Sequence, residues 1–447
     1  MVECFTNFQR QMWLYLHKFG ITRFYIDVSD KGRYVIKSIP SGVFLFWIFL
    51  ANDVLKLIYI LLTYHKLLGI EVHFLDQMSI WDWLLMAMHA TFEWTLWFFK
   101  YPLWENLYRQ WEVQEDIYRK LGRPSEMAAK ITRSDKINTV IYGGIIHIGT
   151  IALAVQFFFT PKYALNTYAI VPADTIPLQI FFCFHEMCFM WHSYAYQASV
   201  MVLAESYATS YQHILEEMNK ALDSIIGSAQ FDLHTTKNSQ DKVTHKKLKR
   251  AAGNVNSDQH LKQALMTYSF RSTSKPIDLN ITAPGTEYDI QTLLADYKRV
   301  MISSMFHNQW IGLVMGPAEA LNYAQFVADV FMLIQLLKEP DTDFFGVFFY
   351  LMDATFGMIM LFRMLILLSR LYPQGKEFVQ SLKTYATFNS SIRRMLVKTI
   401  PTLKVVSAKL TGAVVRPESV PVGINVLINW YICAAMWKRP ADPSRRT

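Results

Sequence analysis

The sequence predicts an all-α protein that crosses a membrane several times. Of its 447 residues, 52% are hydrophobic and 15% are aromatic, whereas only 18% carry a charge. The apolar residues gather in blocks about as long as a bilayer is thick, roughly 17–25 residues each. They do not follow the periods of amphipathic soluble helices. A mean hydropathy of +0.15 indicates that long polar segments separate these blocks.

Seven such blocks define the predicted transmembrane helices. They comprise residues 41–64, 75–99, 137–159, 178–205, 305–337, 346–368 and 420–437. The fourth is expected to continue into a polar helix. The fifth is too long for one crossing, so we expect it to begin below the membrane and to kink at Gly316-Pro317. In the first, Asp53 and Lys56 are spaced to pair across one helical turn.

The distribution of lysine and arginine sets the predicted orientation. The N-terminal segment and the connections after the second, fourth and sixth helices are rich in cations, and the other connections have one lysine each, namely Lys66, Lys162 and Lys338. Because cations favour the cytosolic side, the N-terminus is predicted to be cytosolic and the C-terminus extracellular. The glycosylation sequons at Asn280 and Asn389 then fall on the cytosolic side.

On this basis the chain divides into three parts. Residues 1–223 hold an interfacial, partly helical N-terminal segment and transmembrane helices 1–4. Residues 224–290 form a polar cytosolic insertion, which we expect to be disordered or loosely folded because it is polar and weakly patterned. Residues 291–447 hold helices 5–7, with a cytosolic anchor before the last one.

Several classes of function find no support in the residues. The net charge of +8 is expected to lie near anionic lipid, and no nucleic acid partner is predicted. His185, Glu186 and His192 lack the spacing of two zinc-binding histidines four residues apart. There is also no glycine-rich phosphate loop and no nucleophile elbow. We therefore expect no enzymatic activity, no metal and no cofactor.

Two other polytopic classes stay open as alternatives. Seven helices suggest a G-protein-coupled receptor, although a cytosolic N-terminus is opposite to that class and no DRY-like or NPxxY sequence follows helix 3 or lies in helix 7. A secondary transporter would favour repeated halves, and the sequence has no internal repeat.

The last block is apolar but carries two amides on one stripe. Asn425 and Asn429 are four residues apart, and Ile428, Ile432 and Met436 continue the same side. An unpaired amide is costly in lipid. Either another helix of a bundle accepts these amides, or they face water in a pore, and the residues alone leave both interpretations open.

Four local patterns are spread along the chain. They are FFKYPLWENLYRQWEVQEDIYRKL after helix 2, WHSYAYQASVMVLAESYATSYQHILEEM in helix 4, SSMFHNQWIGLVMGPAEALNYAQFVADVF entering helix 5, and a cytosolic helix with Arg393 and Arg394 that is followed by a break and WYICAAMW. Together they resemble the insect odorant receptors and their gustatory relatives over nearly the whole chain. The third pattern resembles the family's "HQ" helix through His307-Asn308-Gln309.

This resemblance implies an odorant-gated, non-selective cation channel in the plasma membrane, with a gustatory receptor channel of the same superfamily as the alternative. Four copies would surround one pore, as a homotetramer or as a heterotetramer with a co-receptor, and contact membrane lipid. The last helix would line the pore. Its candidate face comprises Val422, Asn425, Ile428, Asn429, Ile432 and Met436.

The resemblance also implies a ligand site between helices 2, 3, 4 and 6, in their outer halves. An aromatic and methionine lining suits a small apolar odorant, because such contacts are undirected and methionine adapts. The same residues could simply pack the bundle. The candidates are Trp83, Met86, Ala87, Ala154, Phe157, Phe158, Phe182, Met190, Phe348 and Tyr350.

Overall fold

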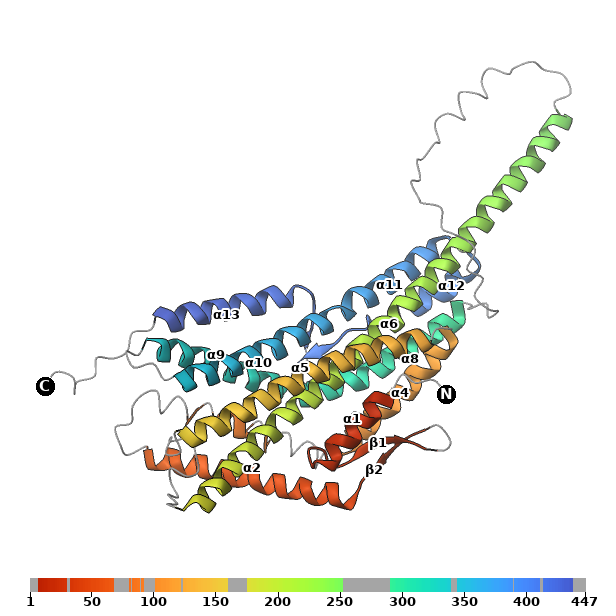
Figure 1. The fold of residues 1–447 in the computed structure, drawn as a ribbon. Coiled ribbons are helices and arrows are strands. Elements are labelled where there is room, and N and C mark those ends of the chain that lie inside the picture. The colour runs from red at the N-terminus through yellow and green to blue at the C-terminus, as the bar shows by residue number, and fades with distance from the viewer. Residues whose placement is uncertain are drawn as a thin grey trace.

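Long helices make up almost all of the protein in the computed structural model (Figure 1). The structure describes residues 7–29, 33–67, 80–81, 83–88, 90–91, 101–121, 124–159, 175–251, 290–338, 344–388, 390–410 and 413–436. The helices are α1 (Asn7–Lys18), α2 (Pro40–Leu67), α4 (Tyr101–Leu121), α5 (Pro124–Phe159), α6 (Ile176–Ala251), α8 (Ile290–Trp310), α9 (Gly316–Leu337), α10 (Phe344–Ser369), α11 (Leu371–Phe388), α12 (Ser390–Thr399) and α13 (Ser419–Met436). The described residues between 80 and 91 are helical as well.

Four of the described helices are long and apolar enough to cross a membrane. These segments are Pro40–Thr63, Thr132–Phe159, Ala320–Leu337 and Gly346–Thr387. They overlap with predicted transmembrane helices 1, 3, 5 and 6, although the segment in the fifth begins at residue 320 and the one in the sixth continues to residue 387. The predicted fourth and seventh are the start of α6 and α13, while residues 75–99 lie partly outside the described part of the chain. The total of seven and the orientation of the termini stay predictions.

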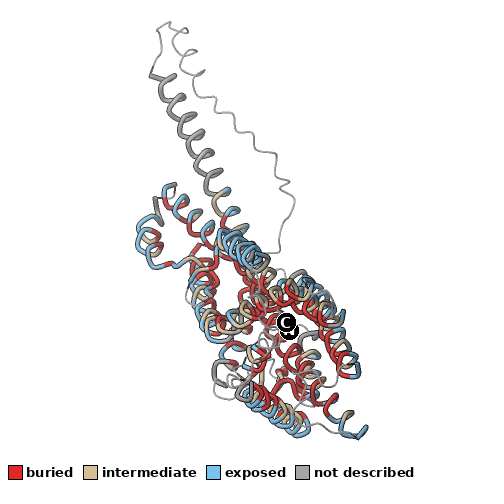
Figure 2. The backbone as a smooth tube through the Cα atoms, turned by 90° about the vertical axis from the view of Figure 1, so that its left-hand side faces the viewer, coloured by how far each residue is buried: buried red, intermediate tan, exposed pale blue. Residues whose placement is uncertain are grey.

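Helix α6 is the central element of the bundle. It contacts α2, α4, α5, α8, α10 and α11, and it is buried on nearly every side between residues 192 and 208. Figure 2 shows that buried residues line the inside of the bundle and exposed ones its outside. The predicted continuation of the fourth membrane helix into a polar helix is confirmed, because α6 extends without a break over 76 residues.

The predicted disorder of residues 224–290 is wrong for their first part, because α6 continues to Ala251. Polar composition alone does not break a helix. Residues 224–251 contain one glycine, Gly227, and no proline, so nothing in their local sequence stops the helix. Residues 252–289 lie outside the described residues.

The N-terminal segment contains a β-hairpin that the sequence analysis did not predict. Strands β1 (Tyr25–Val28) and β2 (Tyr34–Lys37) pair antiparallel. On β1, Asp27 accepts a hydrogen bond of 2.6 Å from Lys37 and also forms an ion pair with Arg10. Burial raises the pKa of the Asp27 carboxyl, but the two cations outweigh it and lower that pKa below its usual range. This hairpin joins α1 to the start of α2.

Between α8 and α9 lies one turn of π-helix, Ile311–Met315. The N–H of Gly316 bonds to the carbonyl of Ile311, five residues back. The next residue, Pro317, has no N–H to donate. Such a wide turn is a frequent site of bending in a helix, and it lies directly before the predicted kink.

Helices α4, α8 and α11 pack together with the segment that leads to α13. These elements form the anchor that the sequence analysis predicts to be cytosolic. Tyr297 of α8 stacks on Phe378 of α11 at 4.2 Å and donates a hydrogen bond of 3.1 Å to the carbonyl of Lys404. Arg299 forms a 2.5 Å ion pair with Asp116 of α4. After a turn of 3₁₀-helix, η3 (Ile400–Thr402), the short strands β3 (Lys409–Leu410) and β4 (Ala413–Val414) pair antiparallel before α13 begins.

The His307-Asn308-Gln309 pattern ties α8 to this segment. Asn308 donates a 2.7 Å hydrogen bond to the carbonyl of Ser407 and accepts one of 2.7 Å from the N–H of Lys409. His307 stacks on Tyr207 of α6 at 4.3 Å. The His307 side chain is fully buried, so this ring packs between the two helices.

A glycine of α11 allows the segment before α13 to cross close by. A Cβ at Gly375 would lie 2.6 Å from the carbonyl oxygen of Val406, which is backbone and has no room to move aside. We expect Gly375→Ala to destabilise the protein by ~1–3 kcal/mol, the usual cost of overpacking, and to lower the midpoint of thermal unfolding in detergent. Gly227→Ala is the matched control, since a Cβ there meets nothing within 4 Å. Equal midpoints for the two variants would contradict this account.

Candidate functional site

An aromatic stack lies where predicted transmembrane helices 2, 4 and 6 meet, in the halves that are predicted to face the extracellular side. The Trp83 ring is almost parallel to that of Phe349 of α10 at 6.4 Å, and it stacks on Phe189 of α6 at 5.9 Å. Five of the predicted ligand residues are buried in the same hydrophobic core, namely Trp83, Met86, Ala87, Met190 and Tyr350. The fold thus brings residues from the predicted helices 2, 4 and 6 together.

The other five predicted ligand residues divide into two groups. Phe157 of α5 and Phe182 of α6 belong to a second, smaller buried cluster, and Ala154 packs against it. Phe158 and Phe348 lie at the surface of the chain, 65% and 42% exposed. The structure therefore buries or half-buries eight of the ten residues and directs two outward.

A buried ion pair lies beside the aromatic stack. The Lys56 Nζ of α2 is 2.5 Å from an Oε2 of Glu186 on α6, and both side chains are fully buried. The same ammonium lies 4.6 Å from the centre of the Trp83 ring, a cation–π distance. The sequence analysis had predicted Asp53, and not Glu186, as the partner of Lys56. The sequence did contain evidence for the Lys56–Glu186 pair, because the two opposite charges lie at similar depths in two apolar blocks.

Asp53 also reaches α6, where its Oδ2 lies 3.0 Å from Nδ1 of His192. Two residues further along α6, Tyr194 donates a hydrogen bond to Asp353 of α10. The same carboxylate accepts a 3.0 Å hydrogen bond from Gln325 of α9. Polar contacts in this layer therefore join α6 to α2 and to α10, and join α10 to α9.

A third polar cluster lies further along α6. Glu205 forms a 2.8 Å ion pair with Arg363 of α10 and accepts a 2.7 Å hydrogen bond from Tyr142 of α5. Asn138 of α5 donates to Glu205 and accepts from Arg363. Glu205 is fully buried, whereas the Arg363 side chain is 29% exposed. Charged groups in an apolar bundle require such partners.

Helix α13 lies along α9 and α10 (Figure 1). Most of its described residues are exposed. All six residues of the predicted pore face are exposed, among them Val422 at 62% and Met436 at 74%. A Cβ at Gly423 would lie 3.9 Å from Leu365 of α10, so this position faces the bundle. At 100° per residue, Asn425 and Asn429 lie on the opposite side of the helix.

Comparisons with known proteins agree with this architecture. No model of a protein family and no curated protein matches the chain. Among solved structures, the insect olfactory receptor OR5 from Machilis hrabei matches with a TM-score of 0.62 at 10% identity, over 96% of this chain and 97% of that one. The same receptor in complex with eugenol matches with a TM-score of 0.64 at 10% identity, over 95% and 96%.

The chain has the fold of an insect olfactory receptor. This fold agrees with the family resemblance inferred from the four sequence patterns. Within the olfactory receptor fold, the chain has a cavity of about 420 Å³ between α1, α5 and α6. None of the ten predicted ligand residues lines this cavity. In the described part of the chain, no three His, Cys, Asp or Glu side chains come together as metal ligands.

The buried ion pair gives a direct test of the packing at the aromatic stack. We expect Lys56→Met to leave Glu186 charged and unpaired, and Glu186→Met to do the same to Lys56. Each change is expected to cost about 3–5 kcal/mol and to reduce the folded, monodisperse fraction in size-exclusion chromatography. The double variant should recover most of that fraction, because an apolar pair of similar volume is tolerated. A double variant no better than either single one would refute the pairing.

Proposed function

We propose that this protein is an odorant-gated, non-selective cation channel of the plasma membrane, in which four chains surround one pore. The observation that carries the proposal is the exposed α13 in a chain with the olfactory receptor fold. The two amides on the outward stripe of this apolar helix are exposed in the single chain, so they need water or further chains as partners. Four copies of that stripe around an axis would supply them.

The residues of the stripe suit a pore of low selectivity. Asn425 and Asn429 would form rings of amides that hydrate a permeating cation without binding it tightly. Ile428, Ile432 and Met436 would form apolar constrictions that close the pore by excluding water. Val422 completes the stripe at the start of the helix.

We assign the odorant site to the aromatic stack around Trp83 and its neighbours in the two buried clusters. The match to a receptor solved with eugenol, a small aromatic molecule, supports a ligand of this kind. Flat aromatic rings and methionines offer undirected contacts to an apolar volatile. The Lys56–Glu186 pair beside Trp83 adds a polar edge, toward which a hydroxyl or carbonyl group of an odorant would turn.

Helix α10 connects the two sites. It carries Phe349 at the aromatic stack and Leu365 beside α13. Between them, Asp353 holds α10 to α6 and α9. An odorant can open the channel only by the difference between its affinities for the open and closed arrangements. Movement of α9 and α10 would carry α13 with it, because α13 packs on both.

The pore face is tested by whole-cell current in cells that express this chain, alone and with an insect co-receptor. Ile432→Ala should increase the current without odorant, because a smaller apolar ring excludes water less well, and Asn429→Ala should change the relative permeability of cations. Tyr431→Phe, on another side of α13, is the matched control. Current only with the co-receptor would indicate a heterotetramer. No current in either case, or glycosylation at Asn280 or Asn389, would reject the channel and its orientation.

The odorant site is tested by dose–response curves for a panel of small volatiles that begins with eugenol. Trp83→Ala should raise the concentration for half-maximal current about tenfold, since a stacked aromatic contact is worth ~0.5–1.5 kcal/mol beyond its buried area. Trp81→Ala is the matched control, because that side chain is 45% exposed on the same helical segment. Equal increases in the half-maximal concentration for both variants would show that the odorant site is not at Trp83.

A further inference from the structure

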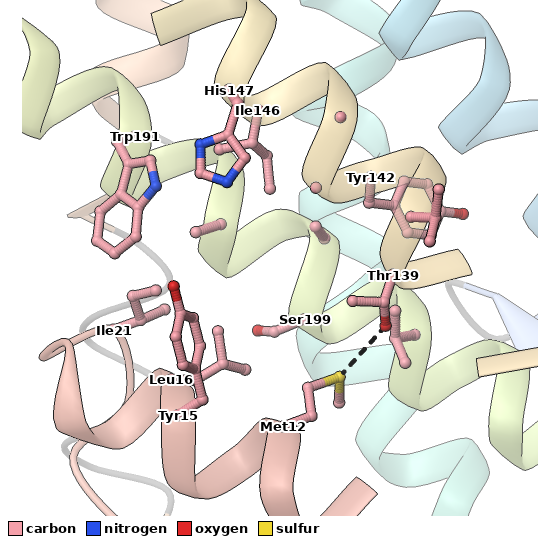
Figure 3. Close-up of a pocket in the computed structure, with 16 residues that line it drawn as sticks. Met12, Tyr15, Leu16, Ile21, Thr139, Tyr142, Ile146, His147, Trp191 and Ser199 are labelled. Atoms are coloured by element: carbon pink, nitrogen blue, oxygen red, sulfur yellow. Dashed lines mark hydrogen bonds between the residues drawn. The ribbon is translucent and has the colours of Figure 1, made fainter. Parts of the chain in front are cut away.

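The cavity between α1, α5 and α6 is apolar and elongated. Figure 3 shows Met12, Tyr15 and Leu16 of α1 on one side and Thr139 to His147 of α5 on the other, with Trp191 and Ser199 of α6 between them. Its volume is about 420 Å³, and no Asp, Glu, Lys or Arg lines it. The predicted third membrane helix begins at residue 137, so with the predicted cytosolic N-terminus the cavity would lie in the inner half of the membrane.

Two adjacent glycines keep this cavity open along α5. A Cβ at Gly143 or at Gly144 would meet no atom within 4 Å. A larger residue at either position would project into the space. Next to these glycines, Val140 is 75% exposed, so the cavity is a groove that opens toward the apolar surface of the bundle.

The groove adjoins a second cavity, which is also mainly apolar but has two polar side chains of α1 in its lining. A second space of about 390 Å³ shares Met12, Tyr15 and Thr139 with the first and reaches Gln11 and Lys18. The side chain of Lys18 belongs to the last turn of α1 and is exposed. The apolar cavity suits an apolar chain of a ligand, and the neighbouring Lys18 suits an anionic group of the same ligand.

Cations also lie on α5. Arg133 and Lys136 are exposed and share a face of α5 with Val140 and Gly144, three to four residues apart. They precede the predicted membrane segment, at the level of lipid headgroups. Among the described side chains from residue 129 to 147, Asp135 is the single acid, and it is buried and accepts a hydrogen bond from Ser206. The mouth of the groove is therefore cationic.

We propose that this groove binds one anionic phospholipid of the cytosolic leaflet. An acyl chain would fill the apolar cavity along Gly143 and Gly144, and the headgroup would interact with Lys18, Arg133 and Lys136. The proposal rests on the membrane orientation proposed above, but not on gating. Lipid binding is measured without any current, so its failure and the failure of the channel function are distinguishable.

The test counts lipids bound to the full chain by native mass spectrometry. The purified protein is equilibrated with equimolar phosphatidylserine and phosphatidylcholine. We expect a preference for phosphatidylserine that weakens about fivefold for each cation removed in Arg133→Gln and Lys136→Gln. Lys376→Gln and Lys383→Gln, two exposed cations of α11, are the matched controls and should leave the preference unchanged.

A second variant addresses the apolar part of the groove. Gly144→Leu should reduce retention of phosphatidylserine at least about tenfold, because the leucine occupies the space of several methylene groups, whereas Gly227→Leu should not. Unchanged binding in Gly144→Leu and in the two α5 charge variants would overturn the proposal. Equal retention of the two lipids would overturn the anionic headgroup, and displacement of the lipid by eugenol would reassign the groove to odorants.

Discussion

The bundle depends on the requirement that polar side chains inside an apolar structure find partners on other helices. Unpaired, each would cost several kcal/mol in an environment without water. In the described part of the chain, helix α6 carries more of these buried polar groups than any other helix. Glu186, Tyr194 and Glu205 lie at three depths along it, and their partners come from α2, α10 and α5 with α10, respectively. The order of these contacts along one long helix fixes which helices surround it and at what height.

The same contacts hold α10 firmly to α6, whereas α13 is held less firmly to the bundle. Helix α10 meets α6 in two of the three layers, through Asp353 and Arg363, so it cannot slide along α6 without exchanging polar partners at both. Such exchanges favour discrete arrangements over continuous deformation. Helix α13 packs only on α9 and α10 among the described helices with close contacts. It also follows a segment that Asn308 holds to α8.

Much of the fold could be predicted from the sequence because its strongest signals are local. Blocks of apolar residues predict α2 and α10 nearly to their ends, and the fifth block lies in a helical stretch that runs from α8 through the π-helical turn into α9. The β1–β2 hairpin was missed because its strands have four residues each, too short for a clear alternation. The helical part of the insertion was missed because polar composition was taken as a sign of disorder, although it lacks helix-breaking residues.

The site was harder to predict because its contacts join residues that are distant in sequence. Lys56 and Glu186 are 130 positions apart, and Arg363 and Asn138 are 225 apart, so no local spacing selects these partners. Spacing along one helix predicts a single face of α13, and Gly423, which faces Leu365, lies on the opposite side of the helix from the two amides. The role of that face stays a prediction.

That difference has a physical reason. The identity of a face depends on helical periodicity alone, whereas its partner depends on how separate helices are packed. The amides of α13 show that the packing within one chain does not explain every polar group. A stripe with Asn425 and Asn429 is too polar to face lipid at no cost and is turned away from the bundle that could accept it. Among the described residues, this exposed stripe is a polar surface whose amides need water or further chains as partners. This is the condition that a pore at the axis of an assembly would fulfil.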